Sequence, residues 1–331
     1  MKAKKLLPIL ALALAATTLT ACGDQSVTFG HYWRTNSLAK NEAFYEHAEY
    51  AVSSTSVQSS YVNYTVAYTG TFTTTLEYVA NDNIYKFDTN LEVTATFKLG
   101  DKEKAVTDTA KTSVTFDAVG NALRPVKSHK EMVCHIPLSG EFSSVENCFI
   151  TVDYSYDIEY ATDKNQGTIK STKYDFTNSK GETKPYVLND TFDFVEDCTN
   201  IDNEQLLVAV RALSADTSSA TLGCYGAFAK SGQKVSVSYT NADEDASNTF
   251  AYTLINAYGE DGGASHNVLT RTAKVVLDQE NPGNTQEIVL AKTKNAENNT
   301  HRNVILSIKN PLSYAMGYIE YKLAKVSYFK A

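Results

Sequence analysis

Hydrophobic and polar residues alternate along a stretch that begins near residue 61. The two sets of alternate positions are Val62, Tyr64, Val66, Tyr68, Phe72, Leu76 and Tyr78 against Asn63, Thr65, Thr69, Thr71, Thr73, Thr75 and Glu77. A period of two is typical of a strand with one buried face, and Tyr, Val and Thr suit strands. The stretch therefore predicts a long β-strand whose Thr-rich face meets solvent.

The same pattern predicts more strands on both sides of the chain's middle. Residues 81–83 and 100–102 have turn chemistry and separate two further long strands at 85–99 and 106–116. Alternation resumes at 150–160. In the last third it predicts shorter strands, at 235–239, 250–258, 268–277, 286–291, 303–309 and 317–329. The stretch 117–147, which holds Pro125, Pro137 and Gly140, is expected to be irregular.

One segment has helical periodicity instead. Asp202 is placed to cap a helix over about 203–213, and Gln205 stands at the capping-box position. The apolar stripe of this helix comprises Leu206, Leu207, Val210 and Leu213. We expect this stripe to dock on a sheet.

These elements predict a mainly β fold. A long-stranded antiparallel sheet with one short helix would be followed by a β-sandwich or jelly-roll-like domain. The domains would be a signal peptide at 1–21, a lipid-anchored tether and N-terminal segment at 22–59, the sheet domain at 60–215 and the sandwich-like domain at 216–331.

The first residues predict where in the cell the protein acts. Three lysines precede an apolar run of about 16 residues, which is short for spanning ~30 Å of hydrocarbon. The run ends in Leu19-Thr20-Ala21-Cys22, which resembles the lipobox of bacterial lipoprotein signal peptides. The resemblance implies cleavage before Cys22 and a diacylglycerol on its sulfur, with the protein at the cell membrane facing outside the cytoplasm. The alternatives are a secretory signal cut elsewhere and an N-terminal anchor helix.

Phe29, Tyr32 and Trp33 follow the lipobox closely. Such aromatic side chains either rest at the lipid headgroups or pack onto the folded domain.

Charge narrows the range of partners. The chain has 30 basic and 38 acidic residues, and loss of the three signal lysines leaves 27 against 38, a net charge of −11. An acidic surface repels phosphates, which argues against nucleic acid as a partner and against binding of anionic lipid by clustered basic residues. We therefore expect the protein to be attached to the membrane through its N-terminal lipid.

Four cysteines remain after Cys22 in an exported chain, where disulfides are permitted. Four cysteines allow three pairings. We expect Cys134–Cys148 and Cys198–Cys224, because each pair flanks one connection, and the alternative is four buried thiols.

No cofactor and no catalytic motif is indicated. Phosphate-binding glycine loops, G-x-S-x-G and H-E-x-x-H are absent from the sequence. The carboxylates of 192–197 have the composition that a glycosidase needs, but a solvated acidic face has the same composition. Oxygen-bearing side chains alternate at Asn241, Asp243 and Asp245 and are candidate calcium ligands. An EF-hand is excluded, because its loop would require Gly where Ala246 stands and Glu where Tyr252 stands.

An N-terminal acyl anchor, long antiparallel strands and a short helix together resemble the half-barrel lipoprotein carriers of bacterial envelopes. The resemblance covers residues 60–215 and implies a curved sheet that cups acyl chains under helical cover. Three functions follow. The first is a non-catalytic binding or scaffold lipoprotein that recognises a glycan or protein. The second is a carrier of lipid or another apolar ligand, and the third is a hydrolase. Exposed aromatic side chains on loops would favour the first, and a buried histidine or two facing carboxylates would favour the last.

Overall fold

A computed structural model describes Val27, Phe29 and residues 44–117, 123–178, 180–185, 189–213, 219–226, 232–240, 247–256, 258–277, 285–292 and 301–330. The elements of the first half are β1 (Tyr45–Ser56), β2 (Thr65–Val79), β3 (Ile84–Leu99), β4 (Lys102–Asp117), β5 (Arg124–Pro137), β6 (Phe149–Ala161), β7 (Gln166–Thr177), β8 (Thr183–Pro185) and β9 (Asn189–Asp193). The middle of the chain forms β10 (Thr199–Asp202), a 3₁₀ turn (Asn203–Gln205), α1 (Leu206–Ala212), β11 (Ser219–Tyr225) and β12 (Gln233–Thr240). The remaining strands are β13 (Ser247–Ala251), β14 (Thr253–Asn256), β15 (Gly259–Glu260), β16 (Ser265–Val276), β17 (Thr285–Ala291), β18 (Ile305–Pro311) and β19 (Gly317–Ser327).

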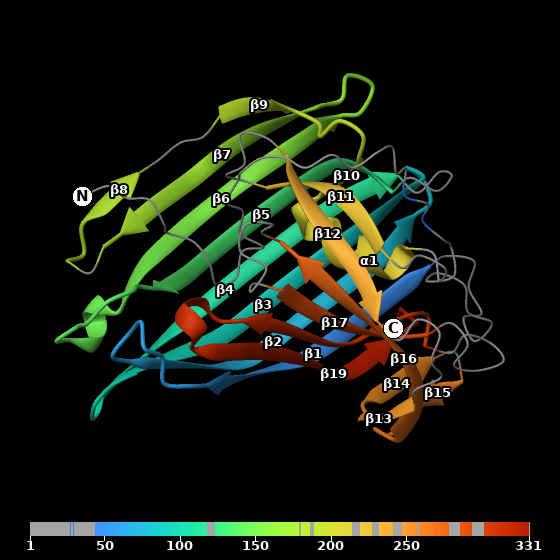
Figure 1. The fold of residues 1–331 in the computed structure, drawn as a ribbon. Coiled ribbons are helices and arrows are strands. Elements are labelled where there is room, and N and C mark those ends of the chain that lie inside the picture. Colours follow the sequence, from blue (N-terminus) through green and yellow to red (C-terminus); the bar gives the residue numbers. More distant parts are fainter. Residues whose placement is uncertain are drawn as a thin grey trace.

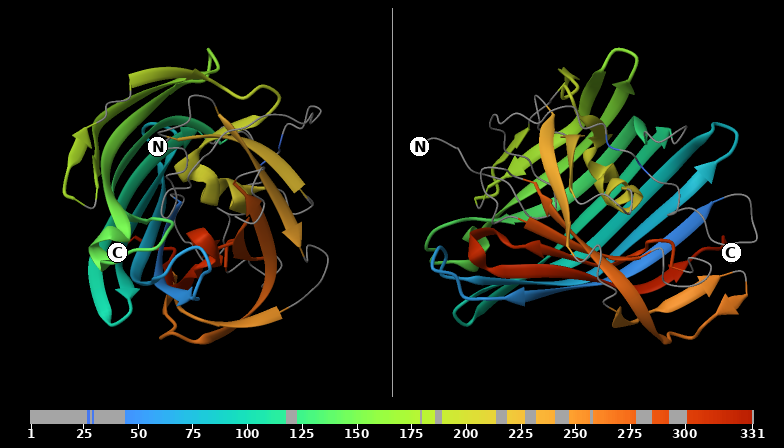
Figure 2. Two further views of the ribbon diagram at one scale, coloured as in Figure 1. Left: turned by 60° about the vertical axis from the view of Figure 1, so that its left-hand side comes forward. Right: turned by 45° about the vertical axis from the view of Figure 1, so that its right-hand side comes forward.

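The protein is mainly β, with long antiparallel strands and one short α-helix in the described part, which confirms the predicted fold class (Figure 1). Strands β1 to β7 pair in chain order, each antiparallel to the next. The first strand also pairs with the last, β1 with β19, and the sheet continues from β19 through β18, β17, β16 and β12 to β11 and β10. Because the sheet curls, its two arms face each other across α1 (Figure 2).

The predicted division at 215–216 separates strands that share one hydrogen-bonded sheet. Ile201 of β10 lies opposite Cys224 of β11, on the two sides of that division. Strand β1, which falls within the predicted N-terminal segment 22–59, pairs with β19 at the other end of the chain. The division itself stays a prediction about folding units.

The strand faces are those that the alternation predicts. On β2, Val66, Tyr68 and Leu76 are buried, whereas Thr69 and Thr71 are exposed. Most of their counterparts on β3 and β4 follow the same rule, so the concave side of the sheet is mainly apolar and the convex side is polar. Asp108 and Thr112 on β4 are the polar exceptions on the buried face.

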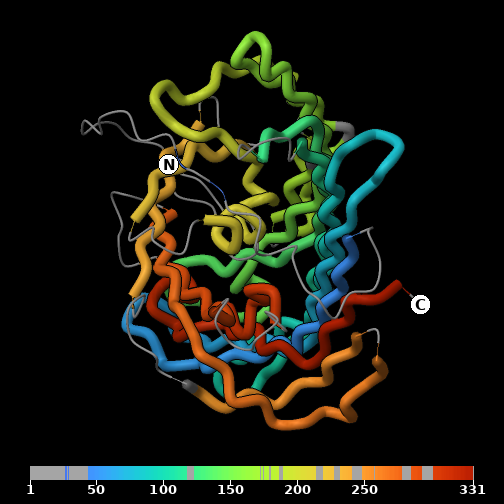
Figure 3. The backbone as a smooth tube through the Cα atoms, turned by 90° about the vertical axis from the view of Figure 1, so that its right-hand side faces the viewer, coloured from blue at the N-terminus to red at the C-terminus, as the bar shows by residue number. Residues whose placement is uncertain are grey.

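The helix lies inside the curled sheet instead of on its surface (Figure 3). All seven residues of α1 are buried, including the side of the helix away from the predicted stripe. Asp202 caps the preceding 3₁₀ turn by accepting a hydrogen bond from the Glu204 backbone N–H at 2.8 Å. The predicted capping box is wrong, because the Gln205 amide donates to the Leu123 carbonyl at 2.7 Å.

The prediction of an irregular segment at 117–147 is also wrong for its middle. Strand β5 occupies Arg124–Pro137, with Pro125 near its first residue and Pro137 at its last. Its buried positions include Ser128 and Lys130, so this strand lacks the fully apolar alternation that identifies β2 and β3. Pro is tolerated at strand ends, so neither proline prevents pairing.

The two expected disulfides do not form, and the four cysteines are thiols in this structure. Cys134 lies opposite Val152 on β6, whereas the carbonyl of Cys148 accepts from the N–H of Leu138, four residues after Cys134 and one residue past the end of β5. Four residues of strand measure about 13 Å, well beyond the ~7 Å limit for a bridge. Cys224 lies opposite Ile201, whereas Cys198 precedes β10 and is three residues from Ile201.

Candidate functional site

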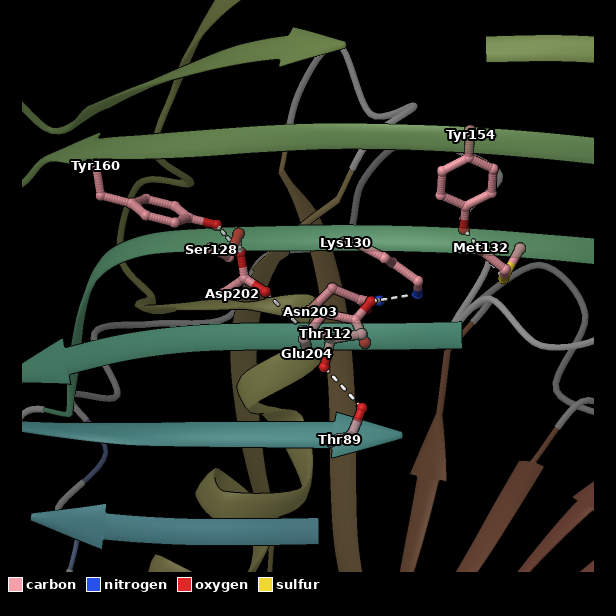
Figure 4. Close-up of polar contacts among 10 residues, drawn as sticks. All are labelled: Thr89, Thr112, Ser128, Lys130, Met132, Tyr154, Tyr160, Asp202, Asn203 and Glu204. Atoms are coloured by element: carbon pink, nitrogen blue, oxygen red, sulfur yellow. Dashed lines mark hydrogen bonds and ion pairs between the residues drawn. The ribbon is translucent and has the colours of Figure 1, made fainter. Parts of the chain in front are cut away.

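A polar network joins the start of the helix to the concave face of the sheet (Figure 4). The Asp202 carboxylate accepts from the Ser128 hydroxyl at 2.5 Å and from the Tyr160 hydroxyl, and its other oxygen caps the 3₁₀ turn. The Lys130 ammonium forms an ion pair with Glu204 at 2.5 Å, and both side chains are buried. Burial raises the pKa of Asp202 to about 6, although the two hydroxyls act in the opposite direction.

The rest of the labelled side chains in Figure 4 pair on the same inner face. Thr89 and Thr112 share a hydrogen bond of 2.7 Å across β3 and β4, and the Tyr154 hydroxyl donates to the Met132 sulfur at 3.3 Å. These two pairs join strands of the sheet, whereas the contacts of Asp202 with Ser128 and of Glu204 with Lys130 fasten the start of the helical segment to β5. The network was missed by sequence reasoning because Ser128 and Lys130 lie on the strand that was not predicted.

The other end of the helix is held by a second buried ion pair. The Arg211 guanidinium binds both carboxylate oxygens of Glu46 on β1, at 2.6 and 2.8 Å. It also donates to the backbone carbonyls of Arg302 and Asn303, each at 3.0 Å. Arg302 and Asn303 have positive φ angles of 48° and 54°, and this left-handed turn directs their carbonyls at the guanidinium.

A histidine cluster lies beside β14. The Tyr252 hydroxyl and His301 Nδ1 are 2.6 Å apart, and the Tyr252 ring stacks on His266 with centroids 4.3 Å apart. His266 Nε2 is 3.0 Å from the carboxylate of Asp261. Burial lowers the pKa of His301 to about 4, with a further contribution from His266, so His301 is neutral near pH 7. In the described part of the chain, no group of three or more His, Cys, Asp or Glu is placed to hold a metal ion.

The other predicted site residues fall into two groups. Cys22 lies outside the described residues, as do the calcium candidates Asn241, Asp243 and Asp245. The carboxylates of Asp193, Glu196 and Asp197 are exposed, which is the solvated-face alternative. Within the described ranges no helix is long and apolar enough to cross a membrane.

Exposed aromatic and aliphatic side chains mark a surface at one end of the long strands. Tyr61 is 64% exposed and Val57 is 50% exposed, and both lie on the connection between β1 and β2. We call these two residues the Tyr61 surface. In Figure 1 this connection lies at the lower-left end of the sheet, together with the β3–β4 turn.

The backbone under the Tyr61 surface is tied to two other segments, residues 140–142 and Met316. The Tyr61 carbonyl accepts from the Gly140 N–H at 3.2 Å, and the Val57 N–H donates to the Met316 carbonyl at 3.0 Å. Asn63 exchanges two hydrogen bonds with the Phe142 backbone, at 2.9 and 3.0 Å. These hydrogen bonds fix the backbone that carries the exposed Tyr61 side chain.

Strained backbone lies directly beside this surface. Tyr314 and Ala315 have φ angles of 56° and 55°, and the Ser59 hydroxyl donates to the Tyr314 carbonyl. The turn closes at Gly317, whose φ is 107° and at which a Cβ would come within 1.9 Å of the Thr55 carbonyl. Strain of this kind persists only where the surroundings over-determine the backbone, and it concentrates at functional sites.

Comparison with known proteins supplies no family. No protein-family model and no curated protein matches the chain. Among solved structures, the chain is similar to the crystal structure of a beta-barrel-like protein of domain of unknown function DUF1849 from Brucella abortus. The two are 10% identical, the match covers 87% of this chain and 99% of that chain, and the TM-score is 0.44.

Proposed function

We propose that this protein is a lipid-anchored, non-catalytic binding protein of the outer side of the cell membrane. The exposed Tyr61, held on a firmly bonded connection beside a strained turn, is the observation that carries the proposal. Flat aromatic faces of this kind stack on sugar rings and on apolar groups of proteins. The lipobox ending at Cys22 supports the anchor, and the acidic charge argues against nucleic acid.

The carrier alternative requires a different state of the molecule. In the half-barrel carriers that the first sheet resembles, acyl chains occupy the concave side of the sheet. Here α1 occupies that side, and Leu206 and Val210 are 0% and 1% exposed. Two buried ion pairs hold the helix there, so a carrier function would require α1 to leave at considerable cost.

An array of cell-envelope glycans, probed with the mature chain carrying Cys22→Ser, tests the proposal. We expect the chain in which Tyr61 is intact to bind at least one glycan on the array. Tyr61→Ala should weaken that binding about tenfold, which corresponds to a loss of ~1.4 kcal/mol. Tyr258→Ala is the matched control, because Tyr258 is equally exposed, at 69%, but lies on the β14–β15 hairpin.

Two results would contradict the proposal. One is that Tyr61→Ala and Tyr258→Ala weaken glycan binding equally. The other is that the chain with Tyr61 intact binds no glycan at all; either result would show that the Tyr61 surface is not a glycan site. A stoichiometric lipid found by mass spectrometry in the purified protein would replace the proposal with the carrier function.

A further inference from the structure

The N-terminal chain is attached to the folded body very soon after the lipobox. The Val27 N–H donates to the Thr199 hydroxyl at 3.2 Å, at the start of β10. Phe29 forms an isolated antiparallel bridge with Leu213 at the end of α1, and its side chain is 1% exposed. For Phe29, packing onto the domain is therefore the correct alternative, and contact with headgroups is wrong.

The attachment point lies at a defined end of the long strands. Leu213 is two residues from Arg211, which is bound to Glu46 at the start of β1. The end of β19 is adjacent, since His47 lies opposite Ser327. The β2–β3 turn belongs to the same end, because Tyr45 lies opposite Glu77 near the end of β2. We call this the anchor end; in Figure 1 it is the right-hand end of the sheet.

Chain length sets how far the anchor end can be from the lipid. Only five residue steps separate Cys22 from Val27, which span at most about 18 Å when fully extended. Strand β3 has 16 residues and is therefore roughly 50 Å long. The far end of the sheet, which carries the Tyr61 surface, is thus well beyond the reach of this short tether.

Two exposed aromatic side chains at the anchor end are suited to contact with a lipid bilayer. Phe329 is 40% exposed and follows β19 by two residues, and Tyr258 is 69% exposed on the hairpin whose Ile255 lies opposite Ser327. A tyrosine ring such as that of Tyr258 has a polar edge and is favoured at the level of lipid headgroups, and the Phe329 ring adds apolar surface beside it.

From these observations we propose that the anchor end is a membrane-facing surface and that its partner is the lipid bilayer. The long strands then stand away from the membrane and present the Tyr61 surface outward, to ligands beyond the headgroups. This inference rests on the proposed lipid anchor at Cys22 and adds an orientation to it.

Matched labels at the two ends of β3 test the orientation. Asp82 precedes β3 and Asp101 follows it, and both are exposed turn residues. Single cysteines, Asp82→Cys and Asp101→Cys, are introduced in a Cys198→Ser background and carry a fluorophore. The lipidated protein is then reconstituted in phosphatidylcholine vesicles that contain a short-range quencher attached to the headgroup.

We expect quenching to be several-fold stronger at residue 82 than at residue 101. Lengthening the tether with about 20 Gly/Ser residues after Gly23 should make the two positions equal, because a flexible linker no longer fixes the orientation. Equal quenching without the insertion, or stronger quenching at residue 101, would overturn the membrane-facing assignment.

Metabolic labelling of the same variants with a clickable fatty acid separates the two proposals. Label on Cys22 together with equal quenching overturns the orientation alone. Absence of label overturns the anchor, and the orientation falls with it.

Discussion

Arg211 brings a positive charge into the interior of the fold, and Glu46 is the carboxylate that meets it. The two residues are 165 positions apart in the chain, so only the folded structure brings them together. Removing one partner of a buried pair leaves the other charge without compensation, which is far more costly than losing an exposed pair.

Arg211→Leu should therefore lower the free energy of unfolding by about 3–5 kcal/mol, measured by urea denaturation. Lys173→Ala, which removes the exposed ion pair with Asp153, is the control and should cost far less, because solvent screens that pair. Similar losses for the two variants would show that the interior tolerates an unpaired Glu46.

His301 predicts a pH dependence whose sign follows from its burial. Its pKa in the folded protein is about 4, whereas an unfolded histidine has a pKa near ~6.5. Between these values the unfolded chain binds the extra proton, so the contribution of His301 to the free energy of unfolding should fall as the pH falls from about 6.5 to about 4. Asp202, whose folded pKa is about 6, contributes in the opposite direction, so the effect of His301 is read from the difference between wild type and variant. His301→Gln should make this decrease shallower in melts across that range. A His301 ring that titrates near ~6.5 by NMR would contradict the prediction.

At the scale of elements, α1 shows how a short helix is stabilised by its surroundings. Seven residues are too few for a stable helix in water, so the sheet that encloses α1 must supply its stability. The Tyr239 hydroxyl on β12 donates to the Val210 carbonyl at 2.7 Å, while Glu204 and Arg211 bind β5 and β1. The helix thereby connects the two arms of the sheet.

Leu206→Ala should cost about 2–5 kcal/mol in denaturant melts, because the side chain is 0% exposed and its loss leaves a cavity. Tyr61→Ala changes an exposed side chain and is the matched control. A loss below about 0.5 kcal/mol for Leu206→Ala would be that of a surface position and would mean that α1 does not fill the interior.

At the scale of the whole molecule, the proposed lipid anchor at Cys22 precedes, in the sequence, the curled sheet that forms the folded body. Cys22 stands before the first described residue, so its substitution should not disturb the body. Cys22→Ser should abolish incorporation of a clickable fatty acid and release the protein from membranes while its thermal melt stays unchanged. Incorporation that persists in this variant would show that the anchor assignment is wrong.

The sequence by itself determined the elements with strong local periodicity. Alternation of two assigns β2, β3 and β4 and their buried faces, and a cap followed by an apolar stripe locates α1. Both signals are contained in neighbouring residues, because side-chain direction is set by local backbone geometry. The expected strands near the C-terminus have the same origin and correspond to β16, β17, β18 and β19.

Only the tertiary structure decided which elements meet. It placed the whole of α1 in the interior, paired β1 with β19 and assigned a strand to Arg124–Pro137. These outcomes depend on contacts between distant segments: Lys130 fits the buried face of β5 because Glu204, 74 residues away, supplies the opposite charge. The separation of cysteines along paired strands likewise excluded both expected disulfides. Local patterns carry no information about such partners, since the free energy that selects them comes from long-range pairing and burial.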